Sequence, residues 1–164
     1  MPSFPDNLPG TAEFDKVVTI LAVSPKEEDH TSLGGIVAHS NWKMYRALAC
    51  SDAMAFLRKN PVAAVVCERD LPDGDWRNVL EQLSDTGSPQ PLLIVTSLHA
   101  DDNLWAEVLN LGGYDVLSKP FDRMEVIRVL GAAWLHWKQL SLAVKKAKTA
   151  SAGGSSTGTL AATA

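Results

Sequence analysis

The amino-acid sequence predicts an α/β fold in which a five-stranded parallel sheet carries helices on both faces. Short apolar runs rich in Val, Ile and Leu alternate with segments of helical spacing along the chain. Most of these runs are continuous rather than interrupted by polar residues, which is typical of strands covered on both sides. Strands and helices in regular alternation indicate a doubly wound parallel sheet whose strands are joined by right-handed crossovers.

Each expected element has its own signal in the sequence. Strands are expected at residues 16–24, 42–48, 62–67, 91–97 and 114–118. Helices are expected at residues 28–40, 53–60, 76–84 and 101–113, and a long fifth helix is opened by Asp122. Ser51 or Asp52 is the expected N-cap of the second helix, and Pro61 marks its end.

The composition excludes several classes of protein. A chain of 164 residues suits one domain with tails, and its net charge of -4 does not favour binding to nucleic acid or to an anionic membrane. Cys50 and Cys67 lie far apart and suit a reducing compartment better than a disulfide scaffold. No apolar run is long enough to span a bilayer, and the N-terminus lacks the pattern of a signal peptide. We therefore expect a cytoplasmic protein.

The chain divides into three expected regions. Residues 1–14 are rich in proline and are expected to form a flexible arm, and residues 15–140 form the domain. Residues 141–164 are expected to be a helix extension and a disordered tail, the disorder starting near Thr149. The basic cluster at 145–148 is expected to aid solubility, because no aromatic platform or recognition helix accompanies it.

The last helix carries an apolar stripe that is longer than one domain needs. Its members, at helical spacing and continuing toward Val144, are Val126, Ile127, Leu130, Trp134, Trp137 and Leu140. Two interpretations stay open. The stripe is either a core face followed by a linker, or an extension that buries Trp134 and Trp137 against a second copy or a partner.

Polar side chains stand where four of the expected strands end. They are Ser24, Glu68, Thr96 and Lys119. Doubly wound sheets bind their ligands at the carboxyl ends of the strands, so these side chains mark the expected site.

Three stretches in this order resemble the receiver domain of bacterial two-component response regulators, over roughly residues 15–140. They are ERDLPDGD at 68–75, VTS at 95–97 and GGYDVLSKPF at 112–121. The resemblance implies a flavodoxin-like (βα)5 fold with strand order 2-1-3-4-5. It implies that Glu68 stands where the family has its phosphoacceptor aspartate. It also implies that Thr96 and Lys119 match the residues that contact the phosphoryl group.

The sequence departs from this family at three places. Ser24 and Pro25 stand where receivers carry an acidic pair that holds Mg²⁺, so no metal is expected. The nearby Glu27, Glu28 and Asp29 are expected to face solvent or to cap the first helix. Val116 stands at the position of the aromatic residue that moves on activation, with Tyr114 as a substitute expected on the same sheet face. Glu68 itself is longer than aspartate by one methylene, which displaces its carboxyl group from the position needed for in-line transfer.

These departures predict an atypical, stand-alone receiver that acts by protein–protein interaction without phosphorylation, and not an enzyme. The expected partner is a histidine kinase or another regulator. Self-association, as a homodimer, would use the fourth helix, fifth strand and fifth helix. Three alternatives remain: a working phosphoacceptor at Glu68 or Asp70, a flavodoxin-like enzyme or ligand binder, and a purely structural Glu68–Lys119 ion pair.

Several other polar residues are expected to have local roles. The carboxylates of Asp70, Asp73 and Asp75 are expected to form turns. His30 and His99 are expected to be exposed loop or cap residues, because no second histidine stands at a metal-ligand spacing.

Overall fold

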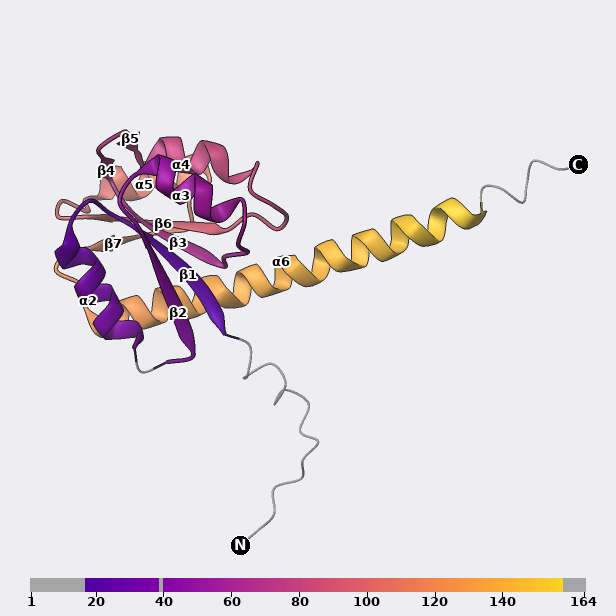
Figure 1. Cartoon of the computed structure of the whole chain (residues 1–164), viewed down its shortest axis with the longest axis horizontal. Coiled ribbons are helices and arrows are strands. Elements are labelled where there is room, and N and C mark those ends of the chain that lie inside the picture. Colours follow the sequence, from indigo (N-terminus) through magenta and orange to yellow (C-terminus); the bar gives the residue numbers. More distant parts are fainter. Residues whose placement is uncertain (1–16, 39, 158–164) are drawn as a thin grey trace, which may run out of the picture.

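The computed structural model describes residues 17–38 and 40–157, so the expected arm at 1–14 lies outside the described residues. Its main sheet has five parallel strands in the order β2-β1-β3-β6-β7. The strands are β1 (Val18–Val23), β2 (Trp42–Ala47), β3 (Ala64–Glu68), β6 (Leu92–Ser97) and β7 (Asp115–Ser118). Counted along this sheet, the order is 2-1-3-4-5, and the predicted fold class is confirmed (Figure 1).

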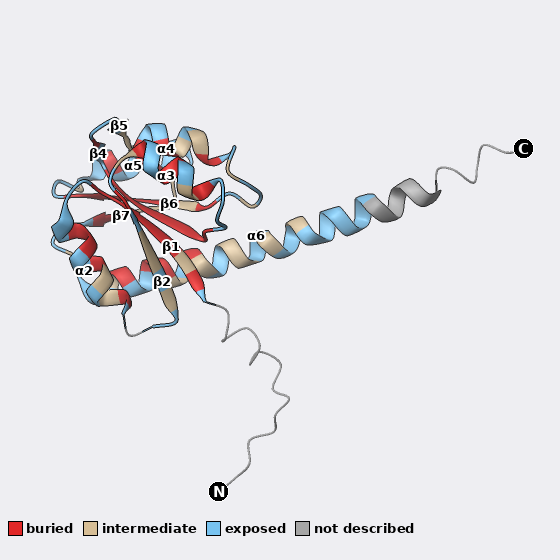
Figure 2. Cartoon of the chain, in the orientation of Figure 1, coloured by how far each residue is buried: buried red, intermediate tan, exposed pale blue. Residues whose placement is uncertain are grey.

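Helices cover both faces of the sheet, as the buried clusters and Figure 2 show. The helices are α2 (Glu27–Val37), α3 (Cys50–Leu57), α4 (Trp76–Leu83), α5 (Asp102–Leu111) and α6 (Arg123–Thr157). Apolar side chains of α3, α4 and α5 pack on one face, and those of α2 and α6 pack on the other. This arrangement follows from the two-residue repeat of a strand, which sends alternate side chains of β1 and β3 to opposite faces.

The central strand β3 is buried along its whole length, and one of its core residues is a thiol. Cys67 is free, lies in the cluster beneath α3 and α4, and is fully shielded from solvent. Burial raises the pKa of the Cys67 thiol, and the nearby Cys50, Glu68 and Asp75 raise it further. The folded protein therefore holds this thiol in its neutral form under conditions that ionise it in the unfolded chain.

This thiol should make the fold less stable in alkaline solution. Above the ordinary thiol pKa of about 8.5, the unfolded chain loses a proton that folded Cys67 keeps, so the stability falls by about 1.4 kcal/mol per pH unit for that group. Urea denaturation between pH 8 and pH 10 should show the slope in wild type and a smaller slope in Cys67→Ala. Equal slopes in the two proteins would contradict the assignment.

A two-stranded hairpin that the sequence did not predict follows β3. Its antiparallel strands are β4 (Asp70–Leu71) and β5 (Gly74–Asp75), in the stretch expected to be a loop. Gly74 closes the turn with a positive φ of 150°, a conformation that favours glycine. Asp75 then caps α4: its carboxylate accepts from the backbone N–H of Arg77, and the side chain of Asn78 accepts from the N–H of Asp75.

The N-cap of α3 is not the one that the sequence predicted. The helix begins at Cys50, before Ser51 and Asp52, and the Ala49 side chain has no oxygen to offer. Instead the Asp73 carboxylate accepts from the backbone N–H of Cys50 at 2.8 Å and from that of Ser51 at 3.0 Å. The expectation of a local cap was wrong, because a side chain from the hairpin turn satisfies these two donors.

Replacing Asp73 should loosen the start of α3. In Asp73→Ala the Cys50 and Ser51 amides lose their shared acceptor, so we expect hydrogen exchange at both amides to become several-fold faster. The same two hydrogen bonds lower the pKa of the Asp73 carboxyl group, so their contribution should also fade in acid as that group is protonated. Asp70→Ala is the matched control on the same hairpin, and equal exchange in both variants would refute the capping role.

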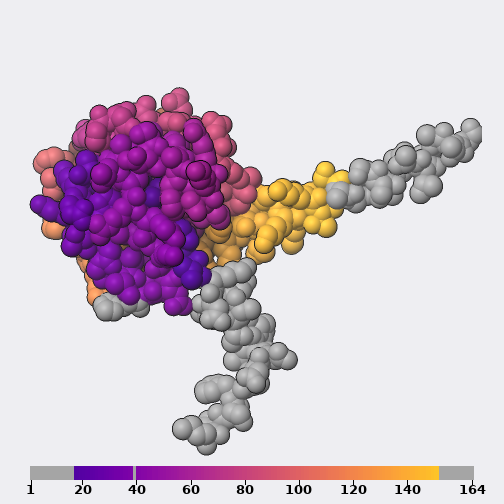
Figure 3. Space-filling model, viewed as in Figure 1, coloured from indigo at the N-terminus to yellow at the C-terminus, as the bar shows by residue number. Residues whose placement is uncertain are grey.

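Helix α6 extends far beyond the sheet. Figures 1 and 3 show that it packs along the domain at its beginning and then projects away from it. Disorder was expected from Thr149 onward, but α6 continues to Thr157, and residues 158–164 lie outside the described residues. Among the described residues, no helix combines the length and apolarity that a membrane crossing requires.

Candidate functional site

Three of the predicted site residues meet at the carboxyl end of the sheet. Glu68 ends β3, Thr96 lies beside it in β6, and Lys119 follows β7 directly. The Lys119 ammonium donates to the Glu68 carboxylate, and the Thr96 hydroxyl donates to the same oxygen at 3.1 Å. Glu68 is only 6% exposed, so this contact is shielded from water. The parallel strands bring the three residues together as the sequence indicated.

Asp29 is a fourth member of the site, and the sequence reasoning missed it. This residue of α2 is buried, and its carboxylate accepts from Lys119 at 3.0 Å and from the Ser24 hydroxyl at 2.6 Å. The expectation that Asp29 faces solvent or caps the helix was therefore wrong. Helical spacing could have found it, because Asp29 precedes Leu33 by four residues and Val37 by eight, and both are buried.

Ser24 and Pro25 differ in what they contribute. Ser24 is buried at the end of β1, and besides its bond to Asp29 its hydroxyl accepts from the backbone N–H of Lys26 at 3.1 Å. Pro25 is exposed. The side chain of one residue of this pair thus takes part in the site, and it does so as a neutral hydroxyl.

His30 forms a hydrogen bond to the same segment from the interior of the protein. It is fully buried rather than exposed, and its Nε2 donates to the backbone carbonyl of Ser24 at 2.8 Å. The expectation of an exposed His30 was wrong for the same reason as for Asp29, because the inner face of α2 begins at these two residues. His99 is exposed, as expected.

The site combines two carboxylates and one ammonium among the described residues. Burial by itself lowers the pKa of Lys119, but the hydrogen bonds and charges of Glu68 and Asp29 outweigh it, so this pKa is raised overall. A raised lysine pKa gives stability that is complete below about pH 10.4 and is lost only above it. Lys119 therefore stays charged, and the ion pairs stay formed, throughout the neutral range.

The site opens to solvent on one side. A cavity of about 280 Å³ reaches Lys119 and Asp29, and its other walls are Lys26, Glu28, Ser32, Leu98, Pro120 and Phe121. Both ion-paired groups are nevertheless covered, because the Lys119 side chain is 6% exposed. A ligand entering from this side would meet an ammonium that already has two carboxylate partners.

Val116 and Tyr114 lie on opposite faces of the sheet. Val116 is buried against the cluster formed with α5, whereas Tyr114 packs against the cluster of α2 and α6, with its ring 5.9 Å from that of His136. The expectation of a common face was wrong, because β7 begins at Asp115 and strand alternation does not reach back to Tyr114. Beside Val116 a cavity of about 380 Å³ lies against Trp105.

The three aspartates of the acidic hairpin have separate surroundings. Asp73 and Asp75 cap helices, and Asp70 is exposed. Within residues 17–38 and 40–157, no three His, Cys, Asp or Glu side chains are grouped so that they could hold a metal ion. The expectation of local turn bonds was wrong for Asp73, whose carboxylate accepts from the N–H of Cys50, 23 residues away. The Asp75 carboxylate does bond locally, to the N–H of Arg77, as the N-cap of α4.

Trp134 and Trp137 lie at the other end of the sheet from Glu68. Both are partly buried against the cluster of α2 and α6. They line the same cavity as Val18 at the start of β1 and Ala63 just before β3. Their packing within the chain favours the interpretation as a core face, with α6 continuing past them into solvent.

Curated proteins and solved structures are similar to this chain. The chain is 30% identical over 115 residues to the probable transcriptional regulatory protein TcrX of Mycobacterium tuberculosis, covering 70% of this chain and 49% of that protein. It is 38% identical over 74 residues to the transcriptional regulatory protein FixJ of Bradyrhizobium diazoefficiens, covering 43% of this chain and 36% of that protein. The chain thus spans between a third and a half of the length of these two relatives.

A solved structure and a family match agree with these relatives. The signal receiver domain of an HD domain-containing protein from Pseudomonas fluorescens Pf-5 superposes with a TM-score of 0.67 at 25% identity, covering 74% of this chain and 90% of that one. Residues 20–130 match the response regulator receiver domain, and they include the whole Glu68–Lys119 site. This match spans most of the chain, which therefore belongs to the response regulator receiver domain family.

Proposed function

We propose that this receiver domain signals through protein–protein interaction without being phosphorylated, with Glu68 at the phosphoacceptor position. The observation that supports this proposal is that the Lys119 ammonium already has hydrogen-bond partners within the protein. Its ammonium already bonds to Glu68 and Asp29, so the group that would contact an incoming phosphoryl group is held inside the protein. The Thr96 hydroxyl donates to the same Glu68 oxygen.

Glu68 imitates a phosphoryl group in part. Its carboxylate brings one negative charge to Lys119 and Thr96, whereas a phosphoryl group brings nearly two charges and three acceptor oxygens. The contacts of Glu68 persist without a donor kinase or a phosphatase. We therefore propose one standing conformation at this end of the sheet, rather than a switch between two.

The residues beside Glu68 do not fit a Mg²⁺ ion. Magnesium requires near-octahedral oxygen ligands, and receivers supply them from an acidic pair after the first strand. Here the pair position offers one hydroxyl, at Ser24, and the Asp29 carboxylate is bound to both Ser24 and Lys119. The Lys119 ammonium already supplies one positive charge between the two carboxylates.

The proposed interaction surface is formed by α5, β7 and the start of α6. Trp105 and Leu109 of α5 are exposed there, and Trp105 is 51% exposed. Asp101 and Asp102 stand at the start of α5 beside the same cavity as Trp105. A partner for this face would bring an apolar side chain for the cavity and basic groups for the two aspartates. Suitable partners are a histidine kinase, another regulator or a second copy of the chain.

The phosphorylation half of the proposal can be tested with a phosphoryl analogue. Wild type is titrated with beryllofluoride and Mg²⁺ and followed by ¹⁹F NMR, and intact mass is measured after incubation with acetyl phosphate. We expect no bound fluoride signal and no mass gain. A receiver with an aspartate acceptor serves as positive control. Saturable Mg²⁺-dependent binding or a phosphoryl mass on Glu68 or Asp70 would overturn the proposal in favour of a working phosphoacceptor.

The interaction half requires a separate measurement. Sedimentation velocity across a range of concentrations shows whether wild type self-associates, and Trp105→Glu places a charge in the centre of the proposed surface. If two copies meet there, the variant should remain monomeric where wild type dimerises. A dimer that survives in Trp105→Glu would place the contact elsewhere on the molecule.

A further inference from the structure

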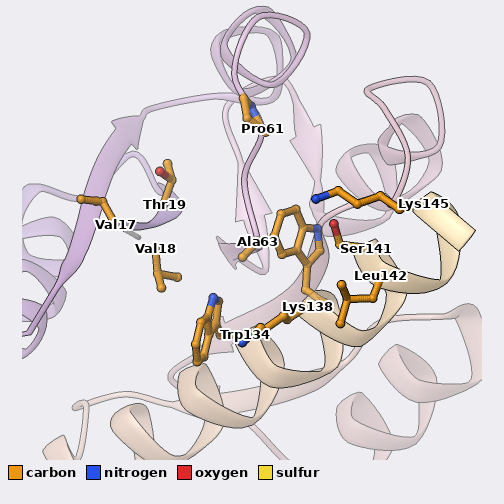
Figure 4. Close-up of a pocket in the computed structure, with 11 residues that line it drawn as sticks. Val17, Val18, Thr19, Pro61, Ala63, Trp134, Lys138, Ser141, Leu142 and Lys145 are labelled. Carbon is orange, nitrogen blue, oxygen red and sulfur yellow. The ribbon is translucent and has the colours of Figure 1, made fainter. Parts of the chain in front are cut away.

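The cavity lined by Trp134 and Trp137 lies at the opposite end of the sheet from Glu68. It has a volume of about 340 Å³ and separates the start of β1 from the middle of α6 (Figure 4). Its walls include Val18, Ala63, Trp134, Trp137, Leu142 and Lys145. A cavity of this size lies within the range that holds small organic ligands in proteins.

The walls of this cavity are mainly apolar. Trp134 and Leu142 of α6 face Val18 and Ala63 across it, and Trp137 belongs to the same lining. Trp137 also carries a buried indole N–H that finds no acceptor among the described residues. A buried donor without a partner is costly, and a ligand oxygen within reach would remove that cost.

The charged side chains in the described lining of the cavity are all positive. Lys138 and Lys145 stand among its lining residues, and the described lining includes no aspartate or glutamate. The Lys138 ammonium lies 5.3 Å from the centre of the Trp134 ring, at the same wall. Glu125 is the last acidic residue of the chain, so α6 has no carboxylate of its own along this stretch. An anionic group at the mouth would therefore meet attraction and no opposing acid from that helix.

We propose that this cavity binds a small apolar molecule with a single anionic head group, such as a medium-chain carboxylate. The apolar tail lies against Trp134 and Leu142, and the head group pairs with Lys145 and accepts from the Trp137 indole N–H. The Ser141 and Thr19 hydroxyls stand in the same lining and supply further donors. The bound molecule joins α6 to the amino ends of β1 and β3. Because the cavity lies at the amino ends of β1 and β3, this site is independent of the state of Glu68.

The first test is isothermal titration of the full chain with decanoate and with decanol as its uncharged counterpart. Decanoate should bind saturably with one molecule per chain, and decanol should bind at least about tenfold more weakly because it lacks the carboxylate. Tryptophan emission should shift with the same affinity, and Trp137→Phe should reduce that shift. Absence of binding by decanoate, or equal binding of the two molecules, would overturn the proposal.

Two lysines on the same helix provide a matched pair of variants. Both side chains are exposed, but Lys145 lines the cavity and its neighbour Lys146 does not. Lys145→Glu should weaken decanoate binding at least about tenfold, while Lys146→Glu, with the same change of net charge, should alter it less than about twofold. Equal losses in the two variants would mean a diffuse electrostatic effect and would refute the site. Glu68→Gln should bind decanoate as wild type does, which separates this test from that of the proposed function.

A second copy of the chain is the competing occupant. If α6 of a neighbouring molecule filled the cavity, tryptophan emission would change with protein concentration in the absence of decanoate, and decanoate would dissociate the assembly. Either result would overturn the small-molecule proposal. A concentration-independent spectrum together with saturable decanoate binding supports it.

Discussion

Lys119→Ala should destabilise the protein by about 3 kcal/mol, because removing one member of a buried ion pair leaves the other charges uncompensated. In this variant the carboxylates of Glu68 and Asp29 would remain in the site without the ammonium that now bonds to both. The expected loss lies at the lower end of the usual range, since the cavity beside Lys119 admits some solvent screening. Urea denaturation at pH 7 measures it.

A neutral side chain of similar length distinguishes this explanation from a simple loss of packing. Lys119→Met keeps most of the aliphatic chain and removes the charge, so its destabilisation should approach that of Lys119→Ala. A Lys119→Met protein as stable as wild type would contradict the electrostatic account.

Two further variants complete the comparison. Glu68→Gln leaves Lys119 paired with Asp29 and keeps the side-chain length, so it should be much less destabilising than Lys119→Ala. Lys26→Ala removes an exposed lysine at the same end of the sheet and should leave the denaturation midpoint unchanged. If Glu68→Gln were as damaging as Lys119→Ala, the Glu68 contact rather than the shared ammonium would dominate the site.

Trp76→Ala should cost about 3–5 kcal/mol, the range for removing a large aromatic side chain from a core. Trp76 begins α4 and is 0% exposed, in the cluster shared with Cys67, Leu71 and Val79. Its removal would leave a void between the hairpin and the sheet that its neighbours cannot close. Thermal and urea denaturation measure the loss.

Trp105 offers a control of the same residue type. It lies on α5 with half of its surface exposed, so Trp105→Ala should cost less than about 1 kcal/mol. The contrast between the two variants reports burial alone, since the same atoms are removed in each. Similar losses would mean that Trp105 packs against something other than solvent, such as a second copy of the chain.

The sheet could be predicted from the sequence because its strands are locally marked. Each strand is an apolar run bounded by polar or turn residues, and alternation with helices leaves few topologies. Glu68, Thr96 and Lys119 could be placed together on the same grounds, since they end parallel neighbours in the sheet. Local sequence patterns were enough to predict contacts that follow from the order of the strands in the sheet.

The predictions that were wrong concern contacts between residues far apart in the sequence. Asp73 caps a helix that begins 23 residues earlier, and no local rule selects it over Ser51. Asp29 reaches Lys119 across 90 residues, and a charged side chain on the inner face of a helix contradicts the usual rule for solvent exposure. The Trp134 and Trp137 stripe was ambiguous because helical periodicity shows which face is apolar but not what covers it.

The length of α6 beyond the domain has a mechanical consequence. A helix rises about 1.5 Å per residue, so Thr157 lies about 30 Å along the axis from Trp137, where the helix still packs against the domain. A rotation of about 10° at that fulcrum would carry the far end through roughly 5 Å. The helix would therefore act as a lever arm. A small rotation of α6 at the domain would displace its far end by about the length of one helical turn.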